Sequence, residues 1–157
     1  MKKEVFVLLN NIRSIHNVGS IFRTASALGV SKIYLSGFTP TPTDRFGKKR
    51  TDFAKVSLGS ENLLNWEYLE NPIRFLNKIK KEGVEIMSIE QDKKSIDYKK
   101  VKIKYPVIFM VGEETKGIDK KILKISDRIV EIPMKGNKES LNVSVSFGVA
   151  LFRILNI

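Results

Sequence analysis

Short apolar runs alternate along the chain with longer segments in which apolar residues recur at helical spacing. Apolar runs bounded by polar, Gly or Pro residues are typical of buried parallel strands, and they predict strands over Val5–Leu9, Lys32–Leu35, Val84–Ile89, Val107–Val111 and Arg128–Ile132. The helical spacing predicts helices over Val18–Leu28, Ile73–Lys81, Lys120–Ile125 and Val143–Leu155. Two of these helices are followed by Gly29 and Gly83, as C-terminal caps would be. The alternation favours an α/β fold, with a mostly parallel sheet and helices on both faces.

The length of 157 residues and the hydrophobic fraction of 42% suit a single folded domain over residues 1–157. No apolar run is long enough to span a membrane, and the absence of cysteine excludes disulfides and thiolate chemistry. A cytoplasmic protein is therefore expected. The net charge of +11, from 28 Lys and Arg against 17 Asp and Glu, favours nucleic acid as a partner over lysines that only solvate the surface.

Three polar loops follow predicted strands and lead toward predicted helices. They are Asn11–Arg23, Gly112–Gly117 and Pro133–Asn142. Loops that follow parallel strands lie at one edge of the sheet, where ligands bind in α/β proteins, so we expect the three to converge. The second and third loops also have plainer interpretations when taken alone, because the second is a possible strand-to-helix turn and Ser140 or Asn142 could simply cap the last helix.

Several kinds of chemistry are disfavoured by the same loops. The glycines of Gly112–Gly117 have the spacing of a phosphate-binding loop, but Ile118 and Asp119 stand where Lys and Ser or Thr are required. His16 is the only histidine, and no acidic cluster has the spacing of metal ligands. We therefore expect no nucleotide triphosphate and no metal, and we do not expect His16 to be a catalyst.

The segment Gly37–Lys55 is predicted to be a long loop in which aromatic and basic residues are interleaved. Its rings are those of Phe38, Phe46 and Phe53. Rings that stack on bases and cations that meet phosphates suit RNA. A solvated loop with its phenylalanines in the core explains the pattern equally well. The cations predicted to contact RNA, here and in the first polar loop, are Arg13, Arg45, Lys48, Lys49 and Arg50.

Taken together and in order, the polar loops resemble the three motifs of the SpoU (TrmH-type) RNA ribose methyltransferases of the SPOUT superfamily. The matching residues are Asn17-Val18-Gly19-Ser20-Ile21-Phe22-Arg23, Gly112–Gly117, and Ile132-Pro133-Met134 with Ser140-Leu141-Asn142-Val143-Ser144. Lys55–Glu61 also resembles a segment of that family, so the resemblance covers nearly the whole chain. It implies a C-terminal trefoil knot, a homodimer, S-adenosylmethionine as the methyl donor and tRNA or rRNA as the substrate. Some members carry a separate RNA-binding domain, which we do not expect here.

Carried over by position, the resemblance implies which residues form each part of the site. The expected cofactor-binding residues are Gly112, Ile132, Met134 and Leu141. The expected catalytic residues are Asn17, Arg23, Glu114, Ser140 and Asn142. Two other functions stay open, an RNA-binding module without activity and a SPOUT enzyme that methylates a base nitrogen. The intact first and third motifs favour the ribose.

Arg23 occupies the position to which family accounts assign the proton acceptor, although a guanidinium is normally always charged. Burial beside the cationic sulfonium could make it neutral. Alternatively it stays charged, grips the adjacent RNA phosphate bidentately and orients the hydroxyl, which is the interpretation we favour. Its apolar neighbours Ile21 and Phe22 predict partial burial of the side chain.

Overall fold

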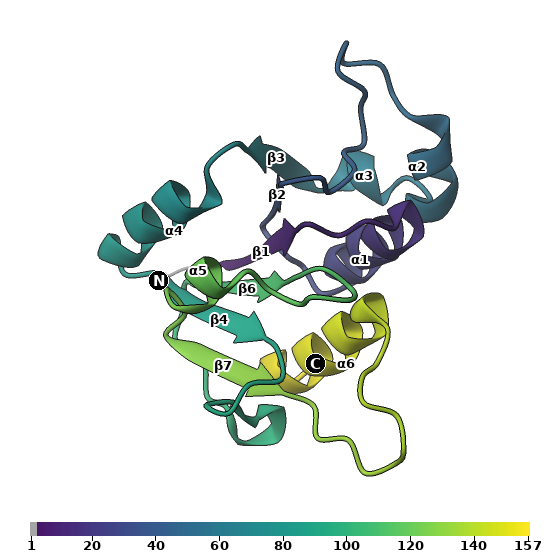
Figure 1. The fold of residues 1–157 in the computed structure, drawn as a ribbon. Coiled ribbons are helices and arrows are strands. Elements are labelled where there is room, and N and C mark those ends of the chain that lie inside the picture. Colours follow the sequence, from purple (N-terminus) through teal and green to yellow (C-terminus); the bar gives the residue numbers. More distant parts are fainter. Residues whose placement is uncertain (1–2) are drawn as a thin grey trace.

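A single sheet of seven parallel strands forms the centre of the computed structural model, which describes residues 3–157 (Figure 1). The strand order is β3-β2-β1-β6-β4-β7-β5. The strands are β1 (Val5–Asn10), β2 (Lys32–Ser36), β3 (Asn65–Leu69), β4 (Glu85–Ile89), β5 (Ile96–Asp97), β6 (Val107–Val111) and β7 (Arg128–Glu131). All five strands predicted from the apolar runs are present, and their ends agree within one residue.

Two strands, β3 and β5, have no counterpart in the hydrophobic pattern, and both lie at the edges of the sheet. Most of the β3 residues are exposed or half-buried, and only Leu69 is buried. The β5 strand contains only two residues. An edge strand needs no continuous apolar run because one of its sides has no strand neighbour, so this part of the sheet escapes a prediction based on apolar runs.

The helices are α1 (Ile15–Ala27), α2 (Thr51–Ser57), α3 (Ser60–Leu63), α4 (Pro72–Lys81), α5 (Lys120–Leu123) and α6 (Val143–Leu155), with a 3₁₀ turn at Tyr98–Lys100. The α1 helix begins three residues before the prediction because Ser14 caps it, accepting a hydrogen bond from the Asn17 backbone N–H at 3.3 Å. The loop predicted over Gly37–Lys55 is wrong at its end, where α2 begins at Thr51. Only two α2 residues are buried, Phe53 and Ser57, which is too few to reveal a helical period.

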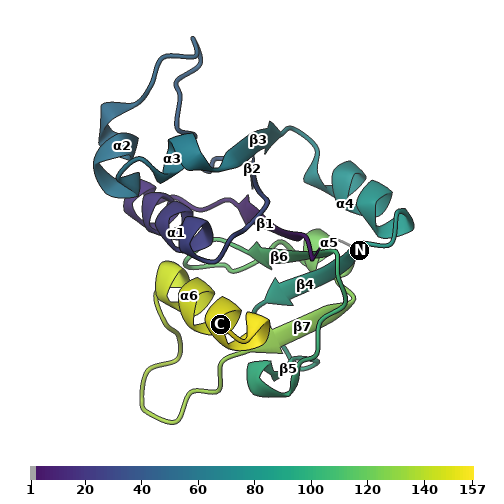
Figure 2. The same cartoon turned by 180° about the vertical axis from the view of Figure 1, so that it is seen from behind.

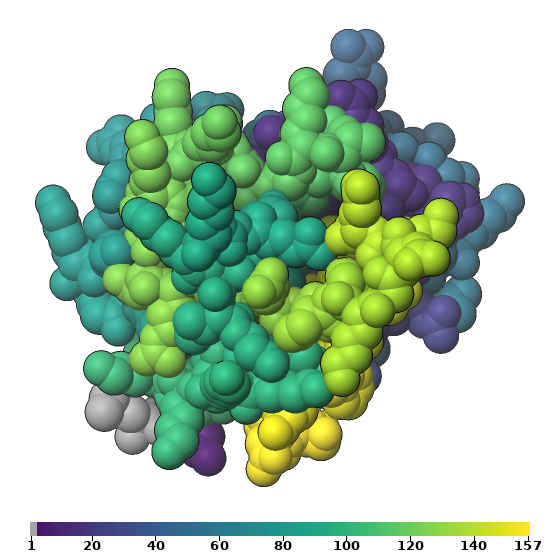
Figure 3. Space-filling model, turned by 60° about the horizontal axis from the view of Figure 1, so that its bottom comes forward, coloured from purple at the N-terminus to yellow at the C-terminus, as the bar shows by residue number. Residues whose placement is uncertain are grey.

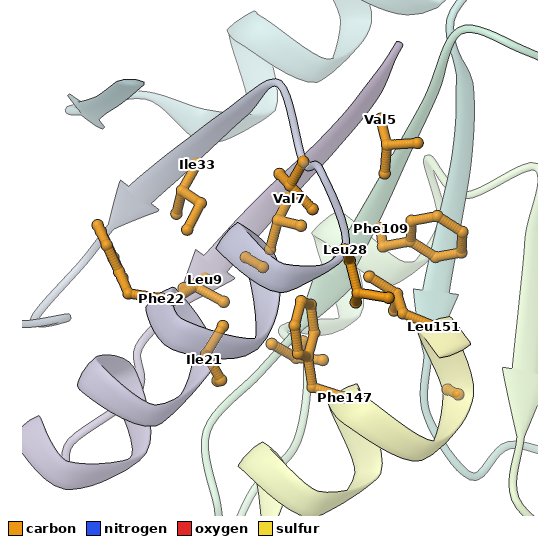
Figure 4. Packing of buried hydrophobic residues seen from close by; sticks show 14 of the residues in the cluster. Val5, Val7, Leu9, Ile21, Phe22, Leu28, Ile33, Phe109, Phe147 and Leu151 are labelled. Carbon is orange, nitrogen blue, oxygen red and sulfur yellow. The ribbon is translucent and has the colours of Figure 1, made fainter. Parts of the chain in front are cut away.

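Helices cover both faces of the sheet, as the alternating pattern predicts (Figures 1 and 2). Residues Val7 and Leu9 of β1 belong to the core beneath α1 and α6, whereas Leu8 belongs to the core beneath α4 and α5. This alternation follows from the two-residue repeat of a strand. Figure 4 shows the first core, where side chains of α1 and α6, including Phe22 and Phe147, meet those of the sheet.

The glycine of the first motif serves helix packing. A Cβ atom on Gly19 would lie 2.7 Å from the Cβ of Val56, so a side chain there would push α2 away from α1. On the other side of this contact, the rings of Phe22 and Phe53 meet edge to face at a centroid distance of 5.2 Å, a favourable arrangement for aromatic pairs. The α2 segment thus supports the helix that carries the first motif. The trefoil knot implied by the resemblance stays a prediction.

Candidate active site

A cavity of about 550 Å³ opens at the carboxyl edge of the sheet, a volume in the usual range for a small-molecule site. Its lining comes from the segments that follow β4, β6 and β7, which are neighbours in the sheet, and from the start of α6. All four residues expected to bind the cofactor line this cavity, namely Gly112, Ile132, Met134 and Leu141. Ligands of parallel α/β sheets bind at this edge.

One wall of the cavity is the turn Gly112–Gly117, which closes on itself. The Glu113 N–H donates to the Gly117 carbonyl at 3.0 Å, and the Gly117 N–H donates back to the Glu113 carbonyl at 2.8 Å. A Cβ on Gly112 would lie 2.5 Å from the backbone carbon and oxygen of Gly117. Backbone atoms cannot move aside as a flexible side chain can, so the turn requires glycine at position 112.

The three polar loops converge at the mouth of this cavity, as predicted. The Asn17 side-chain amide donates to Glu114 Oε1 at 3.0 Å, and the Asn142 amide donates to Asn17 Oδ1 at 3.1 Å. These two hydrogen bonds join residues that are 97 and 125 positions apart in the sequence. We call these three residues, Asn17, Glu114 and Asn142, the polar junction.

Glu114 also accepts hydrogen bonds from the backbone just before α1. The Ser14 N–H donates to Oε1 and the Arg13 N–H donates to Oε2, each at 3.2 Å. Partial burial opposes ionisation of this carboxyl, but the hydrogen bonds from Asn17 and from backbone N–H groups outweigh it, so the pKa of Glu114 lies below its ordinary value. The junction therefore holds a carboxylate at neutral pH.

Asn142 combines the two interpretations that its sequence position left open. Its Oδ1 accepts from the Ser144 N–H at 2.9 Å and from the Ser144 hydroxyl at 2.6 Å, so it does cap α6. Its amide group still points to Asn17 in the polar junction. Ser140, the neighbouring catalytic candidate, is exposed and lines the cavity.

Arg23 lies apart from the other catalytic candidates. Its side chain is exposed, it is absent from the cavity lining, and it is six residues beyond Asn17, which is about 9 Å along the α1 axis. The predicted partial burial is wrong, because Ile21 and Phe22 turn toward the core while the next helical position faces outward. Within a single chain this guanidinium is therefore open to solvent.

The aromatic residues of Gly37–Lys55 divide into two groups. Phe53 is fully buried, as expected for a solvated loop with its phenylalanines in the core. Phe38 and Phe46, by contrast, are 49% and 79% exposed. Each exposed ring carries a guanidinium over its face, with Cζ of Arg13 over Phe38 and Cζ of Arg45 over Phe46, both 4.7 Å from the ring centroid. Two stacked arginine–phenylalanine pairs are thus exposed on the surface.

The five cations expected to bind RNA differ in whether they already form hydrogen bonds or ion pairs within the chain. Arg45 and Lys48 are exposed in a hairpin whose turn is held by Asp44, which accepts hydrogen bonds from the Phe46 and Lys48 N–H groups. Lys49 donates to Asn62 at 2.9 Å. The remaining two form ion pairs, Arg13 with Glu113 at 3.0 Å and Arg50 with Asp52 at 2.8 Å.

Three polar residues of the cavity lining lie outside the polar loops predicted from the sequence, namely Glu90, Gln91 and Glu131. Glu90 and Gln91 follow β4 as the recognised loops follow their strands, so the same rule about the carboxyl edge could have found them. The glutamates give the cavity a distinctive charge, because its lining within residues 3–157 holds five glutamates and one lysine. Over the described part of the chain, no group of three or more His, Cys, Asp or Glu is placed to hold a metal ion, and no helix is long and apolar enough to cross a bilayer.

Known proteins resemble this chain in both sequence and fold. A tRNA (guanosine(18)-2'-O)-methyltransferase from Aquifex aeolicus is 31% identical over 151 residues, which cover 96% of this chain and 68% of the relative. A 23S rRNA (guanosine-2'-O-)-methyltransferase, RlmB from Ralstonia nicotianae, is 30% identical, and the match covers 94% of this chain and 57% of the relative. The chain thus spans between about half and two thirds of the length of these relatives.

Solved structures agree with the sequence comparison. The TrmH/SpoU tRNA modifying enzyme of A. aeolicus superposes with a TM-score of 0.85 at 29% identity, over 99% of this chain and 75% of that one. An AdoMet-bound rRNA methyltransferase from Sinorhizobium meliloti superposes with a TM-score of 0.88 at 25% identity. This match covers 99% of this chain and 57% of that one. Residues 4–152 match the SpoU rRNA Methylase family, which confirms the resemblance drawn from the three motifs. With its motifs gathered at one cavity and the match extending over nearly its whole length, the chain belongs to the SpoU rRNA Methylase family.

Proposed function

We propose that this chain transfers a methyl group from S-adenosylmethionine to a ribose 2′-hydroxyl of tRNA or rRNA. The observation that carries the proposal is the polar junction at the mouth of the cavity, which brings together Asn17, Glu114 and Asn142 from the three motifs. Relatives named as tRNA and 23S rRNA 2′-O-methyltransferases support the same reaction. Cellular tRNA and rRNA as substrates would place the enzyme in the cytoplasm.

The cavity suits S-adenosylmethionine in both charge and shape. Its five glutamates and one lysine would repel a polyphosphate but favour a ligand with a cationic sulfonium. The tight Gly112 turn leaves backbone groups free to approach a ligand closely, and Ile132, Met134 and Leu141 add apolar surface. These four residues would hold the cofactor, and the chemistry supplied when it is bound is an electrophilic methyl group.

The residues at the cavity mouth would orient the acceptor ribose. Asn17 donates to Glu114 and accepts from Asn142, so both amide side chains are held in place. Their remaining hydrogen-bonding groups therefore point in defined directions. Ser140 is exposed beside them and can hydrogen-bond a hydroxyl. Positioning of this kind matters most in an in-line displacement.

The two stacked arginine–phenylalanine pairs form a surface suited to RNA. Arg13 contacts both Phe38 and the carboxylate of Glu113 in the cavity lining, so this pair lies beside the proposed active site. Arg45 and Phe46 extend the surface along the hairpin. A ring with a cation over it offers stacking and charge together, which is how unpaired nucleotides are bound.

We also propose that the chain acts as a homodimer, through the exposed side of α6. Val145, Val149 and Phe152 are exposed at positions that share one face of this helix, and each retains 40% or more of its accessible surface. An identical face on a second copy would cover this apolar stripe. Arg23 lies outside its own chain's cavity, so a catalytic role for it requires the site to be completed by RNA or by the second copy.

Two alternatives predict different products. An RNA-binding module without activity would bind RNA but transfer no methyl group, and a base-nitrogen methyltransferase would label the base. The intact polar junction favours catalysis, because a module that only binds RNA has no need to join three loops beside a cavity of this size.

The deciding experiment supplies S-adenosylmethionine with a labelled methyl group and bulk RNA from a strain that lacks this protein. After digestion to nucleosides, we expect the label in a 2′-O-methylnucleoside, and an Asn142→Ala variant should lose most of it. Label found only in base-methylated nucleosides would refute the ribose assignment. Absence of label together with absence of cofactor binding would support the binding module.

A further inference from the structure

Two consecutive polar residues at the end of β4, Glu90 and Gln91, reach opposite walls of the cavity. β4 lies between β6 and β7 in the sheet, so its end forms the floor between the Gly112–Gly117 turn and the loop that follows β7. The side chain of Glu90 contacts the first wall and that of Gln91 contacts the second. Neither residue belongs to the three motifs.

Glu90 fixes the turn. Its Oε2 accepts from the Ile118 N–H at 2.9 Å, and its Oε1 accepts from the Gln91 N–H at 2.8 Å, so both carboxylate oxygens are engaged. The carboxylate also fills the space beside Gly117, where an added Cβ would lie 2.1 Å from Oε2. A side chain at position 117 would have to displace this carboxylate, and the φ of +72° at this position also favours glycine.

Gln91 fixes the second wall. Its Nε2 donates to the backbone carbonyl of Glu139 at 2.8 Å, across 48 positions of sequence. Figure 3 shows the teal segment after β4 next to the yellow-green loop that follows β7 on this face of the molecule. Residues 135–142 of this loop are all exposed, so few packing contacts restrain it, and a single hydrogen bond has a correspondingly large share in its position.

We propose that Glu90 and Gln91 are positioning residues that hold the two walls of the cavity at the separation which the methyl donor requires. The identity of the ligand rests on the function proposed above, whereas the effect on the walls does not. Glu90 acts through the backbone of Ile118, and Gln91 acts through the backbone of Glu139. Removal of either contact should loosen one wall and weaken cofactor binding.

Matched substitutions separate the backbone contacts from side-chain chemistry. Gln91→Glu keeps the shape but replaces the donor with a carboxylate that faces a carbonyl oxygen. Lys138→Ala is its control, because Lys138 is the exposed neighbour of Glu139 in the same loop and does not line the cavity. Glu90→Leu removes both acceptors, while Glu90→Gln retains a carbonyl oxygen that can accept from Ile118.

The first measurement is the dissociation constant of S-adenosylmethionine by calorimetry. We expect Gln91→Glu and Glu90→Leu to raise it about tenfold, the equivalent of one hydrogen bond of about 1.4 kcal/mol. Lys138→Ala should stay within about threefold of the wild type, and Glu90→Gln should weaken binding less than Glu90→Leu does. The second measurement is amide hydrogen exchange of the ligand-free protein, where Gln91→Glu should accelerate exchange in residues 134–142 but not in β1 or β2.

Weaker binding with unchanged exchange would mean that these side chains contact the ligand directly, and the inference would be overturned. Unchanged binding and unchanged exchange would overturn it as well. If the wild-type protein bound no S-adenosylmethionine, the proposed function would fail, yet the exchange experiment would still decide whether Gln91 holds the loop. The two failures are therefore distinguishable.

Discussion

Reversing the polarity of one hydrogen bond in the polar junction tests whether that junction holds the site together. Asn17 donates to the Glu114 carboxylate at 3.0 Å and accepts from Asn142. Asn17→Asp keeps the acceptor for Asn142 but places a second carboxylate against Glu114. Glu114→Gln then supplies an amide that can donate to the new carboxylate. The double variant therefore restores a hydrogen bond between the same two positions, with donor and acceptor exchanged.

The expected cost of Asn17→Asp follows from the geometry. Two unit charges at 3 Å repel by about 1.4 kcal/mol in water, and the aqueous value is a lower bound because Glu114 is exposed on one side and partly buried on the other. Loss of the hydrogen bond adds about 1 kcal/mol. A carboxylate in the first turn of α1 regains about 0.5 kcal/mol from the helix dipole. The free energy of unfolding should therefore fall by about 2 kcal/mol or more.

The assay is a double-mutant cycle from urea unfolding at pH 7 and low salt, with protein concentration held constant because a dimer would make stability depend on it. We expect a coupling free energy of about 2 kcal/mol, with the double variant more stable than the sum of the single changes predicts. Additivity within about 0.5 kcal/mol would refute the view that this contact stabilises the junction. Methyl transfer by the double variant would show whether the junction's geometry, rather than its charge, supports catalysis.

Four further predictions follow from single features. The stability that Glu114 contributes is present above its ordinary pKa near 4.5 and is lost as pH falls through its lowered folded pKa, so the stabilities of wild type and Glu114→Gln in urea unfolding should converge as the pH is lowered below 4.5. Gly117→Ala should abolish cofactor binding in calorimetry, while Gly47→Ala, also at positive φ but with no atom within 4 Å, should not. Phe46→Leu should weaken the binding of unpaired RNA about tenfold in a titration, and the slope of affinity against salt should stay unchanged because no charge is lost. Phe152→Glu should weaken the dimer about a thousandfold in sedimentation, because its 40% exposed ring would bury roughly 80 Å², or about 2 kcal/mol, in each protomer.

The strands, the main helices and the meeting of three loops could be predicted because each depends on a local pattern. A buried parallel strand must be apolar throughout, and the loop after it must lie at the carboxyl edge, so β1, β6 and β7 fixed where the motifs would meet. The same logic failed where burial is one-sided or brief. The edge strand β3 and the seven-residue α2 show too few buried positions to display a period.

The exposure of Arg23 could not be obtained from its neighbours in sequence. Successive residues of a helix are about 100° apart, so two buried residues say little about the third, and only the packing of α1 against the sheet decides which face is outward. Gln91 illustrates a second limit. Its partner is the backbone of a loop residue 48 positions away, and a backbone carbonyl leaves no mark in the sequence.

The charge of the cavity is opposite in sign to the net charge of the chain, which suits a cationic ligand inside the cavity and an anionic one on the surface. The chain carries a net charge of +11, yet the cavity lining holds five glutamates against one lysine within the described residues. Arg13 lies beside the cavity, the hairpin carries the exposed Arg45 and Lys48, and further exposed lysines are spread over the rest of the surface, including α4. On the function proposed above, Arg13 would attract RNA phosphates to the rim and the cavity glutamates would repel them from the interior. The polar junction stands at the boundary between these two regions, where a ribose held from the outside would meet a methyl group held from within.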